Sequence, residues 1–417
     1  MNLILLIVSV LFYSMTGVTG LIFIGTSILI TYFGALFVKN RKLVLAAVIV
    51  LNAGALFFTK ALPYTEISLA VPLGISYYSM QAISYIVDVY KGKYPPEKSL
   101  YRFALYILYL PHLYIGPIER YNKMAETLYV KRKFTWDNIS NGALRLLFGM
   151  FKKFVIAGRA GIIISTISGD EKYTGAYALL AMLTYSIQLY CDFSGGIDMV
   201  LGVSKMLGIK MSENFDKPYF SQTVKEFWNR WHITLGLFLR DYIYIPLGGN
   251  RKGRVRKHVN VIITFLVSGI WHGIHYVLWG LFNGIFVCIG DKLKTKYKFL
   301  NSLGVFLVIS FLWSFFIWQD TLTALSMFGS VFTTFNYTDL FNNALSLGLS
   351  LADIIILAVS TVTLFLCDFK KQEIKNKVEV LSADKKVAIA LSLLLVIALF
   401  GIYGIGFNAS AFIYSNF

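Results

Sequence analysis

The run VNVIITFLVSGIWHGIHYVLWGLFNGIFVCIG, residues 259–290, has 32 residues and contains no Asp, Glu, Lys or Arg. A helix of that length reaches about 48 Å, which is too long for one crossing of a ~30 Å hydrocarbon layer and too short for two. Basic clusters lie at both ends, at 251–257 and 291–298, and such clusters are typical of the cytoplasmic face. We therefore expect a re-entrant helical hairpin that enters and leaves on the same face. Its midpoint falls near Gly273, which places His272 at the tip.

A polar stripe follows the first arm of this hairpin. Asn260, Thr264, Ser268 and His272 recur every four residues and so share one face of a helix. Because such a stripe is costly against lipid, we expect it to face protein or a watery cavity. One interpretation is a packing stripe that is hydrogen-bonded to a neighbouring helix. The other is chemical, because a neutral imidazole can accept a proton near neutral pH, which makes His272 a candidate general base.

The remaining composition indicates an all-α polytopic membrane protein. The 417 residues are 57% hydrophobic, above the roughly 45–50% of soluble domains. We expect about 10–12 transmembrane helices, with re-entrant and interfacial helices, in one integral domain, 1–417. The charge-free run 1–38 is too long for one crossing and should form two helices that turn near residues 14–17. The net charge of +17 fits basic residues on the cytoplasmic side, so no nucleic-acid partner is expected.

Polar residues concentrate in the block 192–257. Between 205 and 257 there are 11 Lys and Arg against four acids, a net charge of +7. Ser221 is predicted to begin an amphipathic helix that continues to about Tyr244 near the cytoplasmic surface. Its Trp and Tyr residues are typical of membrane interfaces, so an interfacial anchor without chemistry is the alternative.

Two features of this block suggest a site. His232 follows Arg230 and Trp231, and a neighbouring guanidinium disfavours a second positive charge on the imidazole. The loop YIPLGGNRKGRVRK, residues 244–257, combines glycines with basic side chains that can hold phosphates. The alternatives are a surface histidine with a purely structural hydrogen bond and a loop whose charge only keeps it cytoplasmic.

A metal centre is not expected. The five histidines form no ExxH or HxxxH pattern, although His272 and His275 share a face, and the three cysteines form no CxxC pair.

Two segments resemble the signature of the membrane-bound O-acyltransferases. They are NFDKPYFSQTVKEFWNRWHITLGLFLRDYIYIPLGGNRKG (214–253) and SGIWHG (268–273). The similarity is greatest to the bacterial alginate O-acetyltransferase group, which is related to the teichoic acid D-alanyl transferases. Further matching pieces are found at 71–92, 111–121, 192–215 and in the terminal FIYSNF (412–417).

The resemblance implies that His272 is the catalytic histidine, that His232 is a second functional one and that residues 192–290 carry the catalytic core. It also implies helices around a central funnel, with a thioester donor on the cytoplasmic side and an acceptor hydroxyl that reaches in from outside. We expect His232 to orient the donor or to stabilise developing negative charge. Donor-binding or supporting roles are expected for Asn214, Trp228, Arg230, Arg240, Asp241, Asn250, Arg251 and Trp271.

The sequence thus predicts an O-acyltransferase of the bacterial plasma (inner) membrane. It would move an acyl group from a thioester co-substrate, acetyl-CoA or an acylated carrier, to a cell-surface polysaccharide or to an extracytoplasmic transferase partner, with membrane lipids around it and no bound cofactor. Acetyl is favoured because YIPLGGNRKG is closer to the polysaccharide-acetylating branch. The alternatives are D-alanyl transfer to teichoic acid from a carrier protein, a non-enzymatic transporter of a glycan precursor and a non-catalytic scaffold. A transporter often shows inverted repeats, and none is visible in the sequence.

Overall fold

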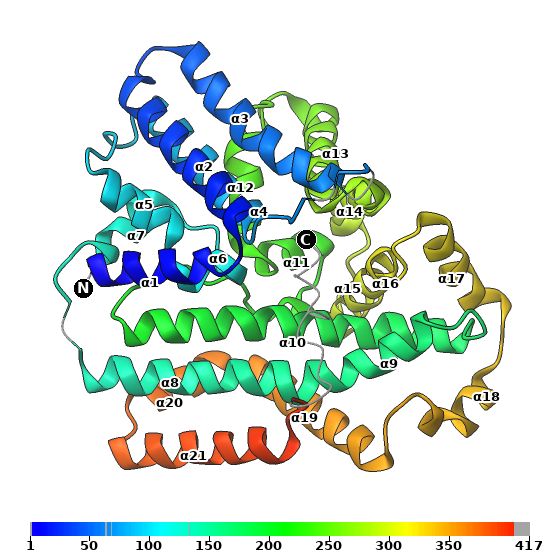
Figure 1. Cartoon of the computed structure of the whole chain (residues 1–417). Helices are drawn as coiled ribbons and strands as arrows, with labels where there is room; N and C mark the ends of the chain where they lie inside the picture. Colours follow the sequence, from blue (N-terminus) through cyan, green and yellow to red (C-terminus); the bar gives the residue numbers. More distant parts are fainter. Residues whose placement is uncertain (1, 63–64, 68, 133, 404–417) are drawn as a thin grey trace. The chain divides into compact units, whose positions relative to one another are not determined.

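The computed structural model describes residues 2–62, 65–67, 69–132 and 134–403 (Figure 1). Within these ranges the chain is helical, and its only β-type pairing is an isolated bridge between Phe215 and Trp231. The terminal motif at 412–417 lies outside the described residues. The predicted all-α polytopic membrane fold is confirmed.

Four helical segments are long and apolar enough to cross a membrane. They are Val18–Phe37 (α2), Lys42–Ala61 (α3), Lys298–Ile317 (α15, Lys298–Leu312, with α16, Ser314–Ile317) and Leu351–Phe369 (α19). Shorter apolar helices are found at Asn2–Ser14, Ile274–Ile289 and Thr321–Thr333. The count of about 10–12 transmembrane helices and the central funnel stay predictions.

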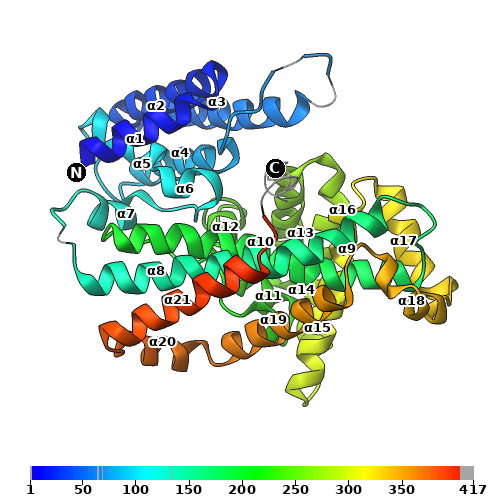
Figure 2. The same cartoon turned by 60° about the horizontal axis from the view of Figure 1, so that its bottom comes forward.

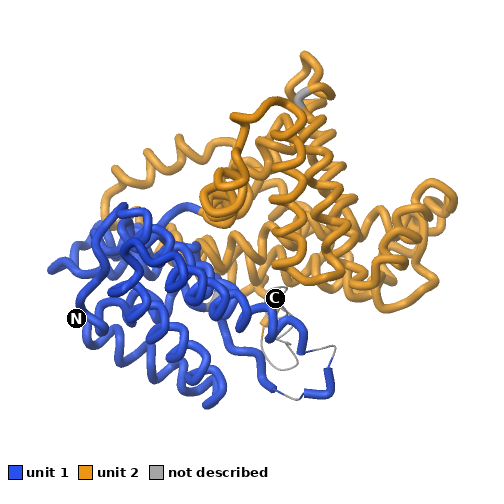
Figure 3. The backbone as a smooth tube through the Cα atoms, turned by 90° about the horizontal axis from the view of Figure 1, so that it is seen from above, with its two compact units in different colours: residues 1–142, 200–213 blue, residues 143–199, 214–417 orange. Residues whose placement is uncertain are grey.

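The backbone divides into two compact units (Figure 3). Unit 1 contains residues 1–142 and 200–213, and unit 2 contains residues 143–199 and 214–417. The prediction of one domain over 1–417 stays a prediction.

Unit 1 begins with the two helices expected from the first charge-free run. The first helix, α1 (Asn2–Ser14), ends where predicted, and α2 begins at Val18. Gly17 joins them with a φ of +102°, a conformation that glycine adopts without steric strain. The other helices of this unit are α3, α4 (Ile75–Tyr90), α5 (Leu100–Leu108), α6 (Leu110–Ile115) and α7 (Tyr121–Leu128).

Two long helical rods lie side by side, and the greater part of each, within residues 143–199, belongs to unit 2 (Figures 1 and 2). One rod joins α8 (Trp136–Met150), the π-helix η2 (Phe151–Ala157) and α9 (Gly158–Ser168), and the other is α10 (Ala176–Met206). A Cβ added at Gly149 would lie 2.5 Å from the carbonyl oxygen of Gly195, so the backbones approach as closely as small residues allow. Helices α19 and α21 (Ala383–Phe400) pack on η2.

The remaining helical segments of unit 2 follow α10 along the chain. They are η3 (Pro218–Phe220), α11 (Val224–Arg230), α12 (Ile233–Leu239), η4 (Arg240–Tyr244), α13 (Gly253–His272), η5 (Ile274–Tyr276), α14 (Val277–Ile289), η6 (Gly290–Lys292), α17 (Thr321–Thr333), α18 (Tyr337–Asn342), η7 (Ala344–Ser346) and α20 (Lys371–Glu379).

The predicted hairpin is present as α13 and α14, which pack against each other. The turn falls at Gly273, whose φ of +151° favours glycine. A Cβ added at Gly269 would lie 2.4 Å from the carbonyl oxygen of Tyr276. A Cβ added at Gly280 would lie 2.4 Å from the carbonyl oxygen of Phe265. Glycines therefore allow the arms to touch through their backbones, and the depth of this hairpin in the membrane stays a prediction.

The prediction of a single amphipathic helix over residues 221–244 is wrong. The chain forms two short α-helices, α11 and α12, and the π-helix η4. The break is at His232, whose backbone has the left-handed φ of +46°. Backbone pairing of residues 230–233 with residues 214–216, which precede the predicted helix, imposes this conformation.

The Gly280→Ala substitution should destabilise the hairpin, because the new methyl group would meet backbone at Phe265, which cannot rotate away. Overpacking of this kind costs about 1–3 kcal/mol, which should lower the melting temperature of the purified protein in detergent.

Gly304→Ala is the matched control. This helical glycine of α15 has no atom within 4 Å of an added Cβ, so its substitution should be neutral or stabilising by up to about 1 kcal/mol. Equal melting temperatures for the two variants would contradict the close packing of the hairpin.

Candidate functional site

Residues 214–216 pair with residues 230–233 and thereby end helix α11. The amide of Asp216 donates to the carbonyl of Arg230 at 2.9 Å, and the amide of Ile233 donates to the carbonyl of Asn214 at 3.0 Å. Between these bonds lies the bridge of Phe215 with Trp231. The helix cannot continue through residues whose backbone groups bond elsewhere, and α12 starts anew at Ile233.

The side chain of His232 is held inside this turn. It is 3% exposed, and its Nδ1 lies 3.3 Å from Oδ1 of Asn214. The same oxygen accepts hydrogen bonds from the backbone N–H (3.0 Å) and the hydroxyl (2.9 Å) of Thr234. Burial lowers the pKa of His232 to about 3, so the imidazole is neutral at physiological pH. His232 lies outside the four apolar helices named above.

Aromatic rings surround the two predicted histidines. The ring centroid of His232 lies 4.9 Å from that of Phe193 and 6.3 Å from that of Trp271. Trp271 also contacts His272 at a centroid distance of 4.6 Å. The structure therefore brings His232 and His272 to the same tryptophan, from segments 40 residues apart in sequence.

His272 is the last residue of α13 and is half-buried. Its ring lies 5.3 Å from that of Trp279 and 5.6 Å from that of Phe316. The predicted stripe that leads to it faces protein, because Asn260 and Ser268 are buried on the same helix. That orientation confirms the expectation from the four-residue spacing.

A cavity of about 430 Å³ lies between α11, α12, η4 and the hairpin. Its apolar wall includes Trp228, Ile233 and Phe265, and Thr264 of the polar stripe also lines it. Three basic side chains and one histidine also line it: Lys225, Arg240, Lys257 and His258. Among the lining residues that the structure describes there is no acidic residue. A cavity of this composition suits a ligand with an apolar arm and an anionic end.

The predicted supporting residues divide into three groups. Trp228, Arg240 and Asn250 line the cavity, and Asn214 and Trp271 contact the histidines. The others neither line the cavity nor contact the histidines in this way: Arg230 pairs with Glu226 at 2.7 Å, Asp241 pairs with Arg240 at 2.8 Å, and Arg251 is exposed on its loop.

Sequence reasoning missed several lining residues. Lys225 was counted only as part of a general basic excess, Lys257 only as the last residue of the basic loop, and His258 was assigned no role. A signal was present, because Lys257, Val261 and Thr264 recur at spacings of four and three on one helix face. Asn283 was also missed, and its Oδ1 accepts a hydrogen bond from the indole N–H of Trp228 at 3.0 Å.

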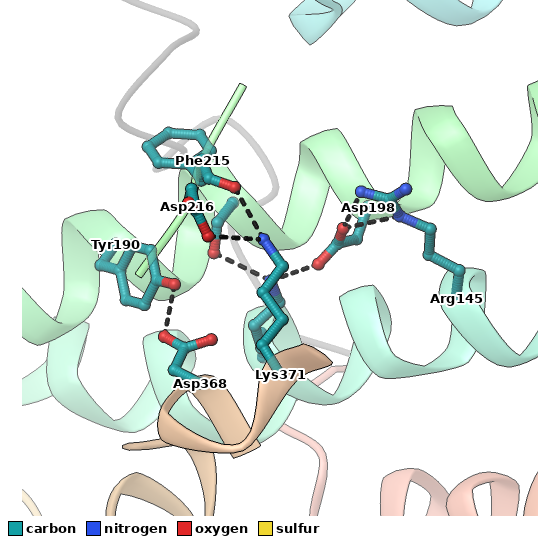
Figure 4. A network of polar contacts seen from close by, with 9 residues as sticks. Arg145, Tyr190, Asp198, Phe215, Asp216, Asp368 and Lys371 are labelled. Carbon is teal, nitrogen blue, oxygen red and sulfur yellow. Dashed lines mark hydrogen bonds and ion pairs between the residues drawn. The ribbon is translucent and has the colours of Figure 1, made fainter. Parts of the chain in front are cut away.

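A network of charged and polar side chains contacts residues 215–216 of the paired segment (Figure 4). Lys371 at the start of α20 donates to the carbonyl oxygen of Phe215 at 3.0 Å and lies 3.5 Å from the carboxylate of Asp216. Asp368, near the C-terminal end of α19, accepts a hydrogen bond from the hydroxyl of Tyr190 at 2.5 Å. The network thus links the end of α19 to α10 and to the segment that holds His232.

The same network ties the two long rods together. Asp198 of α10 accepts hydrogen bonds from Arg145 at 2.9 Å and from Lys152. Lys152 also donates to Ser194 at 2.9 Å, and Lys153 pairs with the buried Asp192 at 2.5 Å. Both lysines lie in the π-helix η2, a type of distortion that is often found at functional sites.

Comparison with known proteins identifies the class to which this fold and site belong. The model of the membrane-bound O-acyltransferase family matches residues 96–352. The chain belongs to this family and is an O-acyltransferase.

Individual relatives cover more of the chain. A protein of Pseudomonas fluorescens named "Probable alginate O-acetylase AlgI" is 35% identical over 87% of this chain and 77% of its own length. The peptidoglycan O-acetyltransferase of Helicobacter pylori is 32% identical over 75% of this chain and 70% of its own. The teichoic acid D-alanyltransferase of Bacillus subtilis is 31% identical over 55% of this chain and 62% of its own.

The Asp198→Asn substitution should destabilise the protein strongly. It leaves Lys152, whose side chain is 4% exposed, without its carboxylate, and an uncompensated buried charge costs about 3–5 kcal/mol. The expected result is a clearly lower melting temperature in detergent.

Glu373→Gln is the matched control. It removes an exposed partner of Lys377, four residues along α20, and such a pair contributes less than about 0.5 kcal/mol. A melting temperature for Asp198→Asn as high as that of the control would show that the network is not important for stability.

Proposed function

We propose that this protein transfers an acetyl group from a thioester on the cytoplasmic side of the bacterial plasma membrane to hydroxyls of a cell-surface polysaccharide. The main support is the meeting of His232 and His272 at Trp271 in a member of an O-acyltransferase family. The acetylating relatives align over 87% and 75% of the chain and the D-alanyl relative over 55%. Acetyl is therefore preferred over D-alanyl.

His272 acts as the general base. Its imidazole accepts the proton of the glycan hydroxyl while the oxygen attacks the thioester carbonyl. The new C–O bond replaces the C–S bond, and the proton leaves on the thiolate to give a free thiol and an ester. The aromatic rings of Trp271, Trp279 and Phe316 around His272 exclude water and so favour transfer over hydrolysis.

The cavity between α11 and the hairpin holds the donor. Its apolar wall fits the pantetheine arm, while Lys225, Arg240 and Lys257 bind the phosphates of coenzyme A or of a carrier's prosthetic group. This arrangement replaces the exposed loop arginines of the sequence-based hypothesis, because Arg251 does not line the cavity. The basic excess around the cavity agrees with a cytoplasmic donor side.

The acceptor reaches the site from the opposite side of the membrane. We propose an exopolysaccharide as the acceptor. We also propose that an extracytoplasmic transferase partner relays the acyl group to it. Loss of glycan esters on deletion of such a partner, with the membrane protein still present, would support the relay. Unchanged esters would exclude it.

The His272→Ala substitution should remove nearly all transfer without affecting folding, because positioned proton transfer contributes about 10²–10⁴-fold. The measurement is the ester content of surface glycans after mild alkaline release from cells with wild-type protein, the variant or no protein. Acetate should be released from wild-type cells alone.

His275→Ala is the matched control, since His275 lies three residues away and contacts Tyr276 at 5.6 Å. It should retain most of the activity. Released D-alanine would move the assignment to the D-alanyl branch. Equal ester in all strains, with expression verified, would exclude the acyltransferase reaction on these glycans and favour the transporter.

Replacing the cavity lysines should weaken donor binding more than turnover. In Lys225→Gln and Lys257→Gln the KM for acetyl-CoA should rise about tenfold each, since a charge-assisted bond contributes about 1.5–3 kcal/mol. With acetyl-pantetheine, which lacks phosphates, the variants should match wild type.

Arg254→Gln is the control for a general loss of positive charge. Arg254 is exposed and does not line the cavity, so the KM for acetyl-CoA should not change. Equal KM values for all three variants would place the anionic end of the donor elsewhere.

A further inference from the structure

The amide of Asn214 has a defined orientation that does not depend on an assumed protonation state. Its oxygen lies 3.0 Å from the backbone nitrogen of Thr234, and a backbone N–H can only donate. The side-chain atom that faces Thr234 must therefore be the oxygen, because a flipped amide would place two donors against each other. The Thr234 hydroxyl, at 2.9 Å from the same oxygen, then donates as well.

This orientation determines the tautomer of His232. Nδ1 of His232 lies 3.3 Å from the same Asn214 oxygen, and an oxygen that only accepts requires a proton on that nitrogen. Because burial keeps the ring neutral, a single proton is present, and Nε2 carries a lone pair. A neutral ring in this state cannot donate a hydrogen bond from Nε2.

We propose, on the basis of the acyl transfer proposed above, that Asn214 is a positioning residue that holds His232 as its Nδ1–H tautomer, so that Nε2 accepts a hydrogen bond from an N–H or O–H group of the bound substrate. Of the two roles expected for His232, orientation of a substrate is therefore retained, and stabilisation of an oxyanion through Nε2 is excluded.

The surroundings of Nε2 support this role. The atom is buried and has no hydrogen-bond partner among the residues that the structure describes. An unpaired buried polar atom is costly because it has given up its hydrogen bonds to water, and such groups are rare in native proteins. A substrate donor at Nε2 would satisfy it. The ring of His232 also lies beside Trp271, the residue that contacts His272.

The backbone reinforces the same arrangement. Asn214 accepts the amide of Ile233 through its own carbonyl, so its main chain and side chain together bind residues 232–234. The left-handed φ of His232 sets the direction of its side chain. Lys371 holds the next carbonyl, that of Phe215, from the other edge, which leaves Asn214 little freedom to rotate away.

The first test is spectroscopic. In full-length protein labelled with ¹⁵N-histidine, in lipid or detergent, the signals of His232 are assigned by their loss in His232→Asn. The expected spectrum has a protonated Nδ1 and a bare Nε2 that do not exchange roles between pH 8 and pH 5. A protonated Nε2 in the wild-type protein would overturn the proposal.

Three substitutions separate the acceptor oxygen from a structural effect. Asn214→Leu removes the oxygen and should give a mixture of tautomers. Asn214→Asp keeps an oxygen at the same place and should preserve the proton on Nδ1. Thr234→Val removes only the hydroxyl and should leave the spectrum unchanged. An unchanged tautomer in folded Asn214→Leu would overturn the role of Asn214.

The second test is kinetic and uses His232→Asn. Asparagine tolerates a positive φ and can still donate to Asn214, but it has no atom at the position of Nε2. The variant should fold with a melting temperature near that of wild type and lose about ten- to a hundredfold in transfer. A rise in KM for the thioester would identify the donor as the partner of Nε2, and a loss in kcat at constant donor KM would identify the acceptor hydroxyl. Wild-type values of both constants would overturn the proposal.

The two proposals fail in different ways. The tautomer is measured without substrate or turnover, so the inference about Asn214 can fail while acyl transfer is intact. Equal glycan ester in cells with and without the protein would overturn the proposed function and leave the tautomer of His232 as measured.

Discussion

The pairing of residues 214–216 with residues 230–233 is the interaction on which the site depends. It takes the backbone groups of Arg230 and Ile233 out of helical hydrogen bonding and requires the left-handed turn at His232. Because α11 stops there, His232 turns inward against Phe193 and does not project from a surface helix. Helix α12 then starts in a new direction, and the space between it and the hairpin becomes the basic cavity.

Features with a local physical cause could be predicted from the sequence. The hairpin follows from a charge-free run of intermediate length with Gly273 at its centre, and the structure turns there. The two helices within residues 1–38 follow from length and from Gly17 in the same way. The polar stripe that ends at His272 could be predicted from its four-residue spacing alone, and its buried members lie on one face of α13.

The break at His232 had no such local signal. Phe227, Trp231, Leu235 and Phe238 are all buried in the broken arrangement, and an unbroken helix would also place them on its apolar side, so periodicity does not separate the two. The deciding contacts come from Asn214, 18 residues before His232, and from Lys371, 156 residues after Phe215. The cavity is equally non-local, because Lys225, Arg240 and Lys257 belong to three elements whose arrangement depends on that break.

The buried charges of η2 and α10 have a role in the same arrangement. Removing ions from water is costly, so such pairs persist where they fix a particular packing, and stability alone is a weak reason for them. Asp192 and Asp198 each meet a basic partner on the α8–η2 rod, and a shift of α10 by one residue would turn both carboxylates by about 100° away from their partners. The pairs therefore set the register of α10. Phe193 directly follows Asp192 and packs on the ring of His232, so the register that satisfies the charges also closes the aromatic wall of the site.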